Sequence, residues 1–255
     1  KAAMKVGAFS NLVRSADCDF DSTTSGLTLT EKVLTPTELQ VNLQICKKEL
    51  HSDWEAAQMG FSAFDNLPPL FSDFVIARVA AEVAQATENS IWGGAAAEGN
   101  FDGFKTIMQA DGTVVDVTGQ SVTAANVIAE LTKIIDAIPA AVYGSDDLVL
   151  YVSTTFAKCY IQAQATLGYA NLYNAGTTEM NFQGIPMFVT PGLQTNNAVA
   201  ARKSNLYFGT GLLNDRNEVK VIDMADIDGS QNVRVVMRYT AGVQIGVGAD
   251  IVLYS

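Results

Sequence analysis

Histidine and cysteine, the residues that most often bind zinc, are scarce in this sequence. Its 255 residues include a single histidine, His51, and three widely separated cysteines, Cys18, Cys46 and Cys159. No CxxC pair occurs, and an odd number of distant cysteines argues against a disulfide framework. A lone histidine with dispersed thiols gives none of the ligand spacings of a zinc site. We therefore expect free thiols, no metal and no cofactor.

Long apolar runs are also missing. The longest ones fall well short of the roughly 20 residues that cross a bilayer, so no membrane-spanning helix and no membrane partner are expected. Residues 1–10 lack the continuous apolar core of a signal peptide. Hydrophobic residues nevertheless make up 48% of the chain and charged residues only 17%, which indicates a folded protein with a substantial core.

Basic residues are few relative to acidic ones. The chain has 16 lysines and arginines against 27 aspartates and glutamates, which gives a net charge of −11. A specific nucleic-acid-binding protein normally carries a basic stripe, whereas the basic residues here are scattered along the sequence. This composition argues against tight, direct binding of DNA, because the acidic balance weakens attraction to a polyanion.

The glycine-rich segment 88–104, ENSIWGGAAAEGNFDGF, raises the question of a phosphate loop. Phosphate loops precede a helix, whose N-terminal N–H groups face the anion. These four glycines instead follow an apolar, helix-like segment, where the exposed carbonyl groups disfavour an anion. We interpret the segment as the end of a long helix followed by a turn.

Other candidate motifs fail on their own residues. Residues 51–53 (HSD) are adjacent, whereas the members of a catalytic triad converge from separate segments. The GTG at 209–211 lacks the third glycine of a dinucleotide fingerprint, because Asn214 stands in that place. The DIDG at 226–229 would put apolar residues at two calcium-ligand positions. No spacing singles out an acid/base carboxylate pair, so no catalytic residue and no enzyme activity are predicted.

The apolar pattern predicts an α+β chain. Residues 39–45 alternate between apolar and polar, as in a half-buried strand. A long helix is predicted from Pro69 to about residue 89, since proline is favoured at a helix start and apolar residues then recur every three or four positions. Helices are also predicted at 121–138 and 154–167, and strands at 147–152, 185–190, 205–208, 218–222, 233–240, 243–247 and 251–254.

The order of these segments resembles that of the HK97-like major capsid proteins of tailed double-stranded-DNA bacteriophages. The resemblance is carried by an irregular start, a ribbon around residues 29–50, a long helix, and the ENSIWGG and FDGF turns. It continues in three later sequences: NFQGIPMFV at 181–189, NLYFGTG with EVKVID at 205–223, and NVRVVMRYTAGVQIGVGADIVLY at 232–254. No single motif is specific, and the match rests on order and spacing over about 200 residues of the chain.

The resemblance implies an HK97-like capsid fold with five parts. These are an N-terminal arm at 1–26, an extended loop and return strand at 27–64, a spine helix at 65–94, a peripheral domain at 95–170 with the helices 121–138 and 154–167, and an axial domain with the closing β-strands at 171–255. It also implies a structural protein of the virion that self-assembles in the host cytoplasm into hexamers and pentamers of an icosahedral shell. The implied partners are further copies of the chain, a portal, scaffold or decoration proteins, and double-stranded DNA held by confinement.

Two alternatives stay open from the sequence. One keeps the fold and makes the chain the shell of an encapsulin-like protein compartment. The other is a small α+β enzyme with an unrecognised carboxylate site. Under the capsid interpretation, an apolar ribbon is only marginally stable by itself and needs a neighbouring copy to cover it. The residues that we predict at this assembly interface are Leu39, Val41, Leu43, Ile45 and Trp54.

Overall fold

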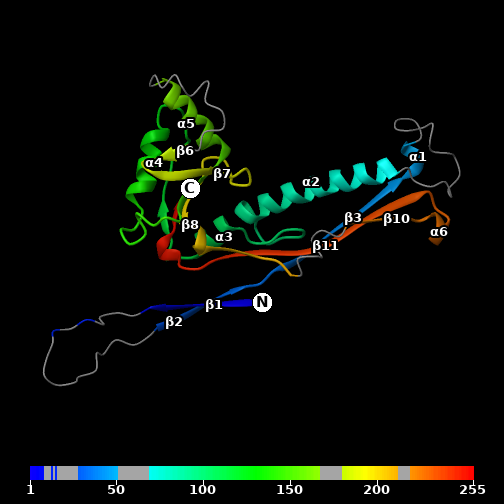
Figure 1. Cartoon of the computed structure of the whole chain (residues 1–255), viewed down its shortest axis with the longest axis horizontal. Helices are drawn as coiled ribbons and strands as arrows, with labels where there is room; N and C mark the ends of the chain where they lie inside the picture. Colours follow the sequence, from blue (N-terminus) through cyan, green and yellow to red (C-terminus); the bar gives the residue numbers. More distant parts are fainter. Residues whose placement is uncertain (9–12, 14, 16–27, 51–68, 167–179, 212–218) are drawn as a thin grey trace.

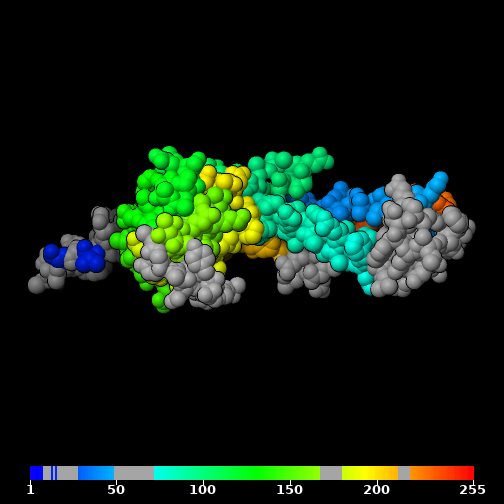
Figure 2. Space-filling view, turned by 90° about the horizontal axis from the view of Figure 1, so that it is seen from above, coloured from blue at the N-terminus to red at the C-terminus, as the bar shows by residue number. Residues whose placement is uncertain are grey.

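The computed structural model describes residues 1–8, 13, 15, 28–50, 69–166, 180–211 and 219–255. These residues form a two-stranded ribbon, a long sheet backed by a long helix, and a compact unit with a six-stranded sheet (Figure 1). Figure 2 shows the compact unit, in green and yellow, beside one end of the long helix, in cyan. The predicted α+β class is confirmed.

The ribbon consists of β1 (Ala2–Ala8) and β2 (Thr28–Leu34). The two strands are antiparallel, with Ala2 opposite Leu34 and Ala8 opposite Thr28. Figure 1 shows the ribbon extending away from the rest of the molecule. The prediction of an irregular arm at 1–26 is therefore wrong for its first residues, which form a strand.

The long sheet is organised around one strand, β11 (Asn232–Ile245). On one edge β11 pairs with β3 (Thr37–Cys46) over ten residue pairs. On the other edge it pairs with β10 (Val219–Asp223) and, further along, with β9 (Leu206–Gly209). The predicted strand at 39–45 is confirmed, whereas the predicted strands at 233–240 and 243–247 are a single strand.

The helix α2 (Pro69–Gly93) lies along one face of this sheet. Its buried Val75 and Val79 pack against Val235 of β11, with partly buried valines of β3 and β10 around them. The predicted helix start at Pro69 is confirmed. Two short helices, α1 (Lys47–Leu50) and α6 (Ala225–Asp228), mark the far end of the sheet in Figure 1.

The glycine-rich segment ends α2 by bringing backbone groups very close together. A Cβ atom at Gly94 would lie 2.3 Å from the carbonyl oxygen of Phe101, and one at Gly103 would lie 2.5 Å from that of Ser90. Gly103 N–H also donates to the carbonyl of Gly94 at 2.9 Å. The interpretation as a helix end and turn is confirmed, and the chain continues into α3 (Phe104–Ala110).

The compact α/β unit contains a six-stranded sheet in the order β4-β12-β8-β5-β7-β6. The β12–β4 and β5–β7 pairs are parallel and the other pairs are antiparallel. A short 3₁₀ turn at Lys203–Asn205 follows β8, and another at Gly248–Asp250 precedes β12. The strands are β4 (Val115–Val117), β5 (Leu148–Val152), β6 (Met180–Phe182), β7 (Ile185–Val189), β8 (Ala198–Arg202) and β12 (Val252–Tyr254).

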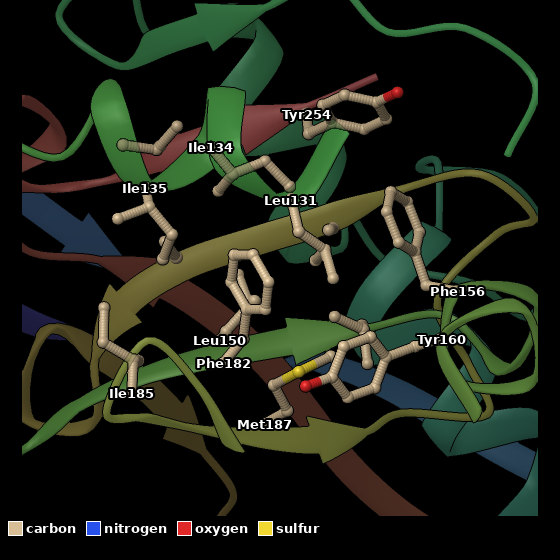
Figure 3. Packing of buried hydrophobic residues seen from close by; sticks show 14 of the residues in the cluster. Leu131, Ile134, Ile135, Leu150, Phe156, Tyr160, Phe182, Ile185, Met187 and Tyr254 are labelled. Carbon is tan, nitrogen blue, oxygen red and sulfur yellow. The ribbon is translucent and has the colours of Figure 1, made fainter. Parts of the chain in front are cut away.

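Both faces of the six-stranded sheet are covered by apolar side chains. On one face lie α4 (Val127–Asp136) and α5 (Thr154–Thr166), and Figure 3 shows side chains from both helices and the sheet gathered in one cluster. On the other face, Trp92 of α2 and Phe104 of α3 join the side chains of β8 and β12. The α/β unit is therefore packed directly onto the end of the long helix.

The predicted domain boundary at residue 170 is wrong. Strand β5, which precedes that position, is hydrogen-bonded to β7 and β8, which follow it. Helix α4 also begins later than predicted, at Val127 rather than at residue 121. The Asn126 side chain accepts hydrogen bonds from the backbone N–H and the hydroxyl of Thr123, which holds the preceding residues in a turn.

The turn after α2 gives a direct test of its packing. We expect Gly94→Ala to lower the free energy of unfolding by about 1–3 kcal/mol, because the new methyl group meets backbone atoms that cannot rotate away. Gly112→Ala is the matched control, since nothing lies within 4 Å of a Cβ at that position. Urea unfolding of both variants measures the difference, and equal unfolding midpoints would contradict the packing argument.

Candidate assembly surfaces

The β1–β2 ribbon exposes most of its side chains to solvent. Leu29 is 59% exposed and Val33 is 41% exposed, while Leu34 at the base is buried. An isolated two-stranded ribbon is marginally stable in water, because it buries too little apolar surface to offset its ordering. The described part of the ribbon therefore has exposed apolar surface at Leu29 and Val33.

The base of the ribbon is attached to the body of the molecule by three contacts. The side chain of Leu34 packs so closely over Gly209 that a Cβ atom there would lie 2.2 Å from Leu34 Cδ2. The Gln244 side chain donates to the carbonyl of Val33 at 3.2 Å. Lys32 Nζ forms an ion pair with Asp111 Oδ2 at 2.5 Å. These contacts fix the direction in which the ribbon leaves the body.

The ion pair at the ribbon base changes the acidity of its carboxylate. Burial by itself would raise the pKa of Asp111, but hydrogen bonds from Lys32 and Thr113 outweigh it and lower the pKa to about 2. Asp111 therefore stays ionised, and the ion pair persists, over the whole ordinary pH range. The carboxylate acts as a structural anchor for Lys32.

A pH titration can detect this anchor. The pKa of Asp111 is about 2 in the folded chain, below its ordinary value of 3.8, so its contribution to stability is present above pH 4 and is lost as the pH falls toward 2. Between pH 4 and pH 2, we expect the free energy of unfolding of the wild type to fall by on the order of 1 kcal/mol more than that of Asp111→Asn. The difference is this small because solvent screens part of the interaction. Urea unfolding at each pH measures this, and parallel pH profiles would contradict it.

The predicted interface residues of β3 have different environments in the structure. Leu39 is 7% exposed and belongs to the core that contains Trp92, so it does not form part of an assembly surface. Val41 and Ile45 are partly buried against the core formed with α2. Leu43 is 40% exposed and keeps its place as a proposed interface residue. Trp54 lies outside the described residues.

Two substitutions on the same face of β3 separate folding from assembly. Val41→Asp would put a carboxylate against the valine cluster of α2, and we expect it to lower the free energy of unfolding by about 2–4 kcal/mol. Leu43→Asp should change the free energy of unfolding by less than about 0.5 kcal/mol and lower the yield of assembled particles. Thermal unfolding and particle sedimentation measure the two effects. Equal loss of stability in both variants would contradict this assignment.

Apolar side chains are also exposed on both sides of the α/β unit. Phe188 of β7 is 46% exposed, and its ring lies 6.5 Å from Tyr151 and 4.9 Å from Lys203 Nζ. On the side covered by α4 and α5, Ile128 and Ile161 are 37% and 44% exposed. A head-to-tail contact between identical subunits needs two different surfaces of this kind on each copy.

A buried polar network holds the C-terminal strand to α4. The Tyr254 hydroxyl donates to Glu130 Oε2 at 2.8 Å and accepts from the backbone N–H of Gln120 at 3.0 Å. Burial and then the Glu130 carboxylate raise the pKa of Tyr254 to about 12. Burial opposes ionisation of Glu130, but hydrogen bonds from Lys133 and Tyr254 lower its pKa. These groups satisfy one another, as in a structural network.

The surface hollows of the described residues include the following two. One, of about 430 Å³, is at the ribbon base and is lined by residues that include Lys32 and Asp111. The other, of about 1060 Å³, is a groove between the long sheet and the turn after α2. Within the described ranges no cluster of three or more histidine, cysteine or carboxylate side chains could hold a metal, and no helix is long and apolar enough to cross a membrane.

Comparison with known proteins identifies the fold. No family model and no curated protein matches the sequence. A subunit from the capsid of a native GTA particle superposes with a TM-score of 0.64 at 15% identity, covering 99% of this chain and 84% of that one. A chain from Gordonia phage Cozz gives 0.62 at 11% identity, with 99% and 80% covered. A virus-like particle from Pyrococcus furiosus gives 0.52 at 12% identity, with 99% and 86% covered.

The chain therefore has an HK97-like capsid fold, and the predicted resemblance to phage capsid proteins is confirmed at the level of the fold. Sequence analysis predicted the long helix and the strand that pairs with β11. It did not find the β1–β2 pairing or the groove on the long sheet. The only signal for β1 was the alternation of Met4 and Val6 with Lys5.

Proposed function

We propose that this chain is the major structural subunit of an icosahedral phage shell, built from hexamers and pentamers and enclosing double-stranded DNA. The observation that carries the proposal is the ribbon: among the described residues its side-chain contacts with the body are at its base, and it projects with exposed apolar side chains. Such a ribbon gains stability when a neighbouring copy covers it. The capsid and virus-like particle among the similar structures support this function.

The two exposed sides of the α/β unit support its place in a ring. When identical subunits contact each other head to tail around an axis, each copy presents one surface to the next copy and a different one to the previous copy. Phe188 and Ile161 lie on opposite sides of the six-stranded sheet and fit that requirement. We therefore assign the α/β unit to the axial part of the subunit, and the long sheet with α2 to the peripheral part.

Many weak contacts are sufficient for such a shell. An interface of roughly 800 Å² per partner is modest, but each subunit repeats it with several neighbours. The net charge of −11 suits a wall that confines DNA without binding it tightly. As a phage shell subunit, the chain would assemble in the host cytoplasm and become part of the virion. Its further partners would be a portal and scaffold or decoration proteins.

A second shell function is supported by the fold that this chain shares with the virus-like particle from Pyrococcus furiosus. In that case the chain would form an encapsulin-like compartment around protein cargo. The material that copurifies with the particles distinguishes the two functions. Long double-stranded DNA supports the phage shell, and a stoichiometric cargo protein supports the compartment.

Electron microscopy with light scattering tests the proposal. We expect the purified chain to form closed particles. A chain that starts at Thr28 lacks β1, and we expect it to unfold within about 1 kcal/mol of the full chain but to lose at least ~90% of its particles, because the ribbon buries little of its own chain's core. Unchanged particle yield would contradict the role of the ribbon. A stable monomer of 27.2 kDa from the full chain would favour the enzyme alternative instead.

A further inference from the structure

A short turn between β11 and β12 touches two ion pairs. The turn is the 3₁₀ segment Gly248–Asp250. At its end, Asp250 Oδ2 forms an ion pair with Arg202 Nη2 of β8 at 2.5 Å. At its start, Gly248 packs against the carboxylate of Asp111, which anchors the ribbon base. One turn of three residues therefore contacts both the six-stranded sheet and the anchor of the ribbon.

Gly248 leaves no space between the turn and the anchor carboxylate. A Cβ atom at this position would lie 2.8 Å from Asp111 Oδ2 and 2.3 Å from Thr113 Oγ1. Asp111 Oδ2 is also the oxygen that accepts from Lys32 Nζ, and the Thr113 hydroxyl donates to the other carboxylate oxygen at 2.6 Å. Close-packed groups have low compressibility, so a shift of the turn displaces the carboxylate.

The end of β8 holds this turn at further points. Strand β8 leads into the 3₁₀ segment Lys203–Asn205, whose last residue is buried. The Asn205 side chain accepts from the backbone N–H of Val247 at 2.7 Å and donates to the carbonyl of Val247 at 2.8 Å. The Asn205 carbonyl also accepts from the N–H of Gly246 at 3.0 Å. Together with the Arg202 ion pair, these bonds tie the position of the turn to the end of β8.

The segment that holds the turn also forms part of an exposed surface. Lys203 is exposed, and its Nζ lies 4.9 Å from the centroid of the Phe188 ring, which is exposed as well. This surface is one of the two sides of the α/β unit that we assign to contacts between copies. Bonded and packed groups therefore connect it, through Arg202 and the turn, to Lys32 at the ribbon base.

We propose that the turn Gly248–Asp250 sets the direction of the ribbon and couples that direction to the position of the end of β8. Gly248 is a positioning residue, because it acts on the ribbon through Asp111. A neighbour that binds the surface around Phe188 would displace the end of β8, and the ribbon would turn with it. The neighbour in this step rests on the proposed shell function, whereas the coupling is a property of a single chain.

Spin labels measure the direction of the ribbon within one chain. The labels are attached at Thr30→Cys of β2 and Gln85→Cys of α2, both exposed positions, in a chain whose native cysteines are replaced by serine. Size exclusion provides the single-chain fraction, and double electron–electron resonance gives the distribution of distances between the labels. We expect one narrow distribution at pH 7 and at pH 3, since the pKa of Asp111 is about 2.

Two glycine variants test the packing behind the anchor. We expect Gly248→Ala to widen the distance distribution at least twofold at pH 7, because its methyl group displaces the Asp111 carboxylate from Lys32. Gly112→Ala is the matched control, since its methyl group enters open space and its distribution should equal that of the wild type.

Lys32→Met removes the anchor directly and gives the width of an unanchored ribbon. A wide distribution in Lys32→Met with an unchanged one in Gly248→Ala overturns the role of the turn. An unchanged distribution in Lys32→Met overturns the role of the anchor, and the proposal with it. Circular dichroism confirms that each variant is folded.

Asp250→Ala distinguishes a mechanical link from a change in charge. Around Asp111, Lys32 is positive, whereas Asp102 in the same hollow and Asp250 in the turn are negative. Removal of Asp250 leaves Arg202 without this partner, so electrostatics alone would lower the pKa of Asp111 and keep the ribbon anchored at pH 3. The coupling predicts the opposite result. A loosened turn weakens the Lys32 contact, raises the pKa of Asp111 toward 3.8, and widens the distribution at pH 3 at least twofold.

Asp146→Ala is the matched control for this change. It removes an exposed carboxylate from the same α/β unit, before β5 and outside both the turn and the end of β8. We expect its distribution to equal that of the wild type at both pH values. A narrow distribution in folded Asp250→Ala at pH 3 overturns the coupling. Because the readout comes from single chains, that result leaves the shell function standing, and a full chain that forms no particles contradicts the shell function alone.

Discussion

Strand β11 is the constraint on which the other parts of the subunit depend. Its 14 residues pair with β3 along one edge and with β10 and β9 along the other, so it joins segments that are nearly 200 residues apart. One of its faces packs on α2 through Val235, and a short 3₁₀ turn connects the strand to β12 of the six-stranded sheet. The long sheet, the helix and the α/β unit consequently form one continuous framework.

The ribbon depends on that framework at one end only. Leu34, Val33 and Lys32 attach its base to residues of β9, β11 and the loop after α3, and the remaining length has no such partners among the described residues. In the proposed shell, fixing the base would reduce the conformational entropy that the ribbon loses on binding a neighbour. A preset direction would also limit the angles at which two copies can meet. Exposed apolar surface and fixed orientation together would favour ordered assembly over random aggregation.

The sequence predicted features that depend on local chemistry and missed those that depend on a distant partner. The start of α2 followed from Pro69, and the strand character of β3 followed from its alternation. Strand β11 was predicted as two strands on either side of Ala241-Gly242, but this glycine lies inside one strand, where a Cβ atom would be 3.0 Å from Pro36 Cα. The β1 strand is rich in alanine and glycine, and even its closest pair, Ala8 with Thr28, is 20 positions apart in the sequence. For Leu39, alternation correctly indicated burial, but it could not tell whether the same chain or a neighbour provides the cover.

The charge distribution reconciles an acidic subunit with self-assembly. In the proposed shell, copies with a net charge of −11 would repel one another at long range, which would keep unassembled subunits dispersed and let weak, misplaced contacts dissociate. Short-range attraction would then come from exposed apolar side chains, such as Leu29 and Val33 of the ribbon. Repulsion between whole subunits and attraction between apolar surfaces act at different distances, and together they would favour a closely fitting neighbour over any other approach.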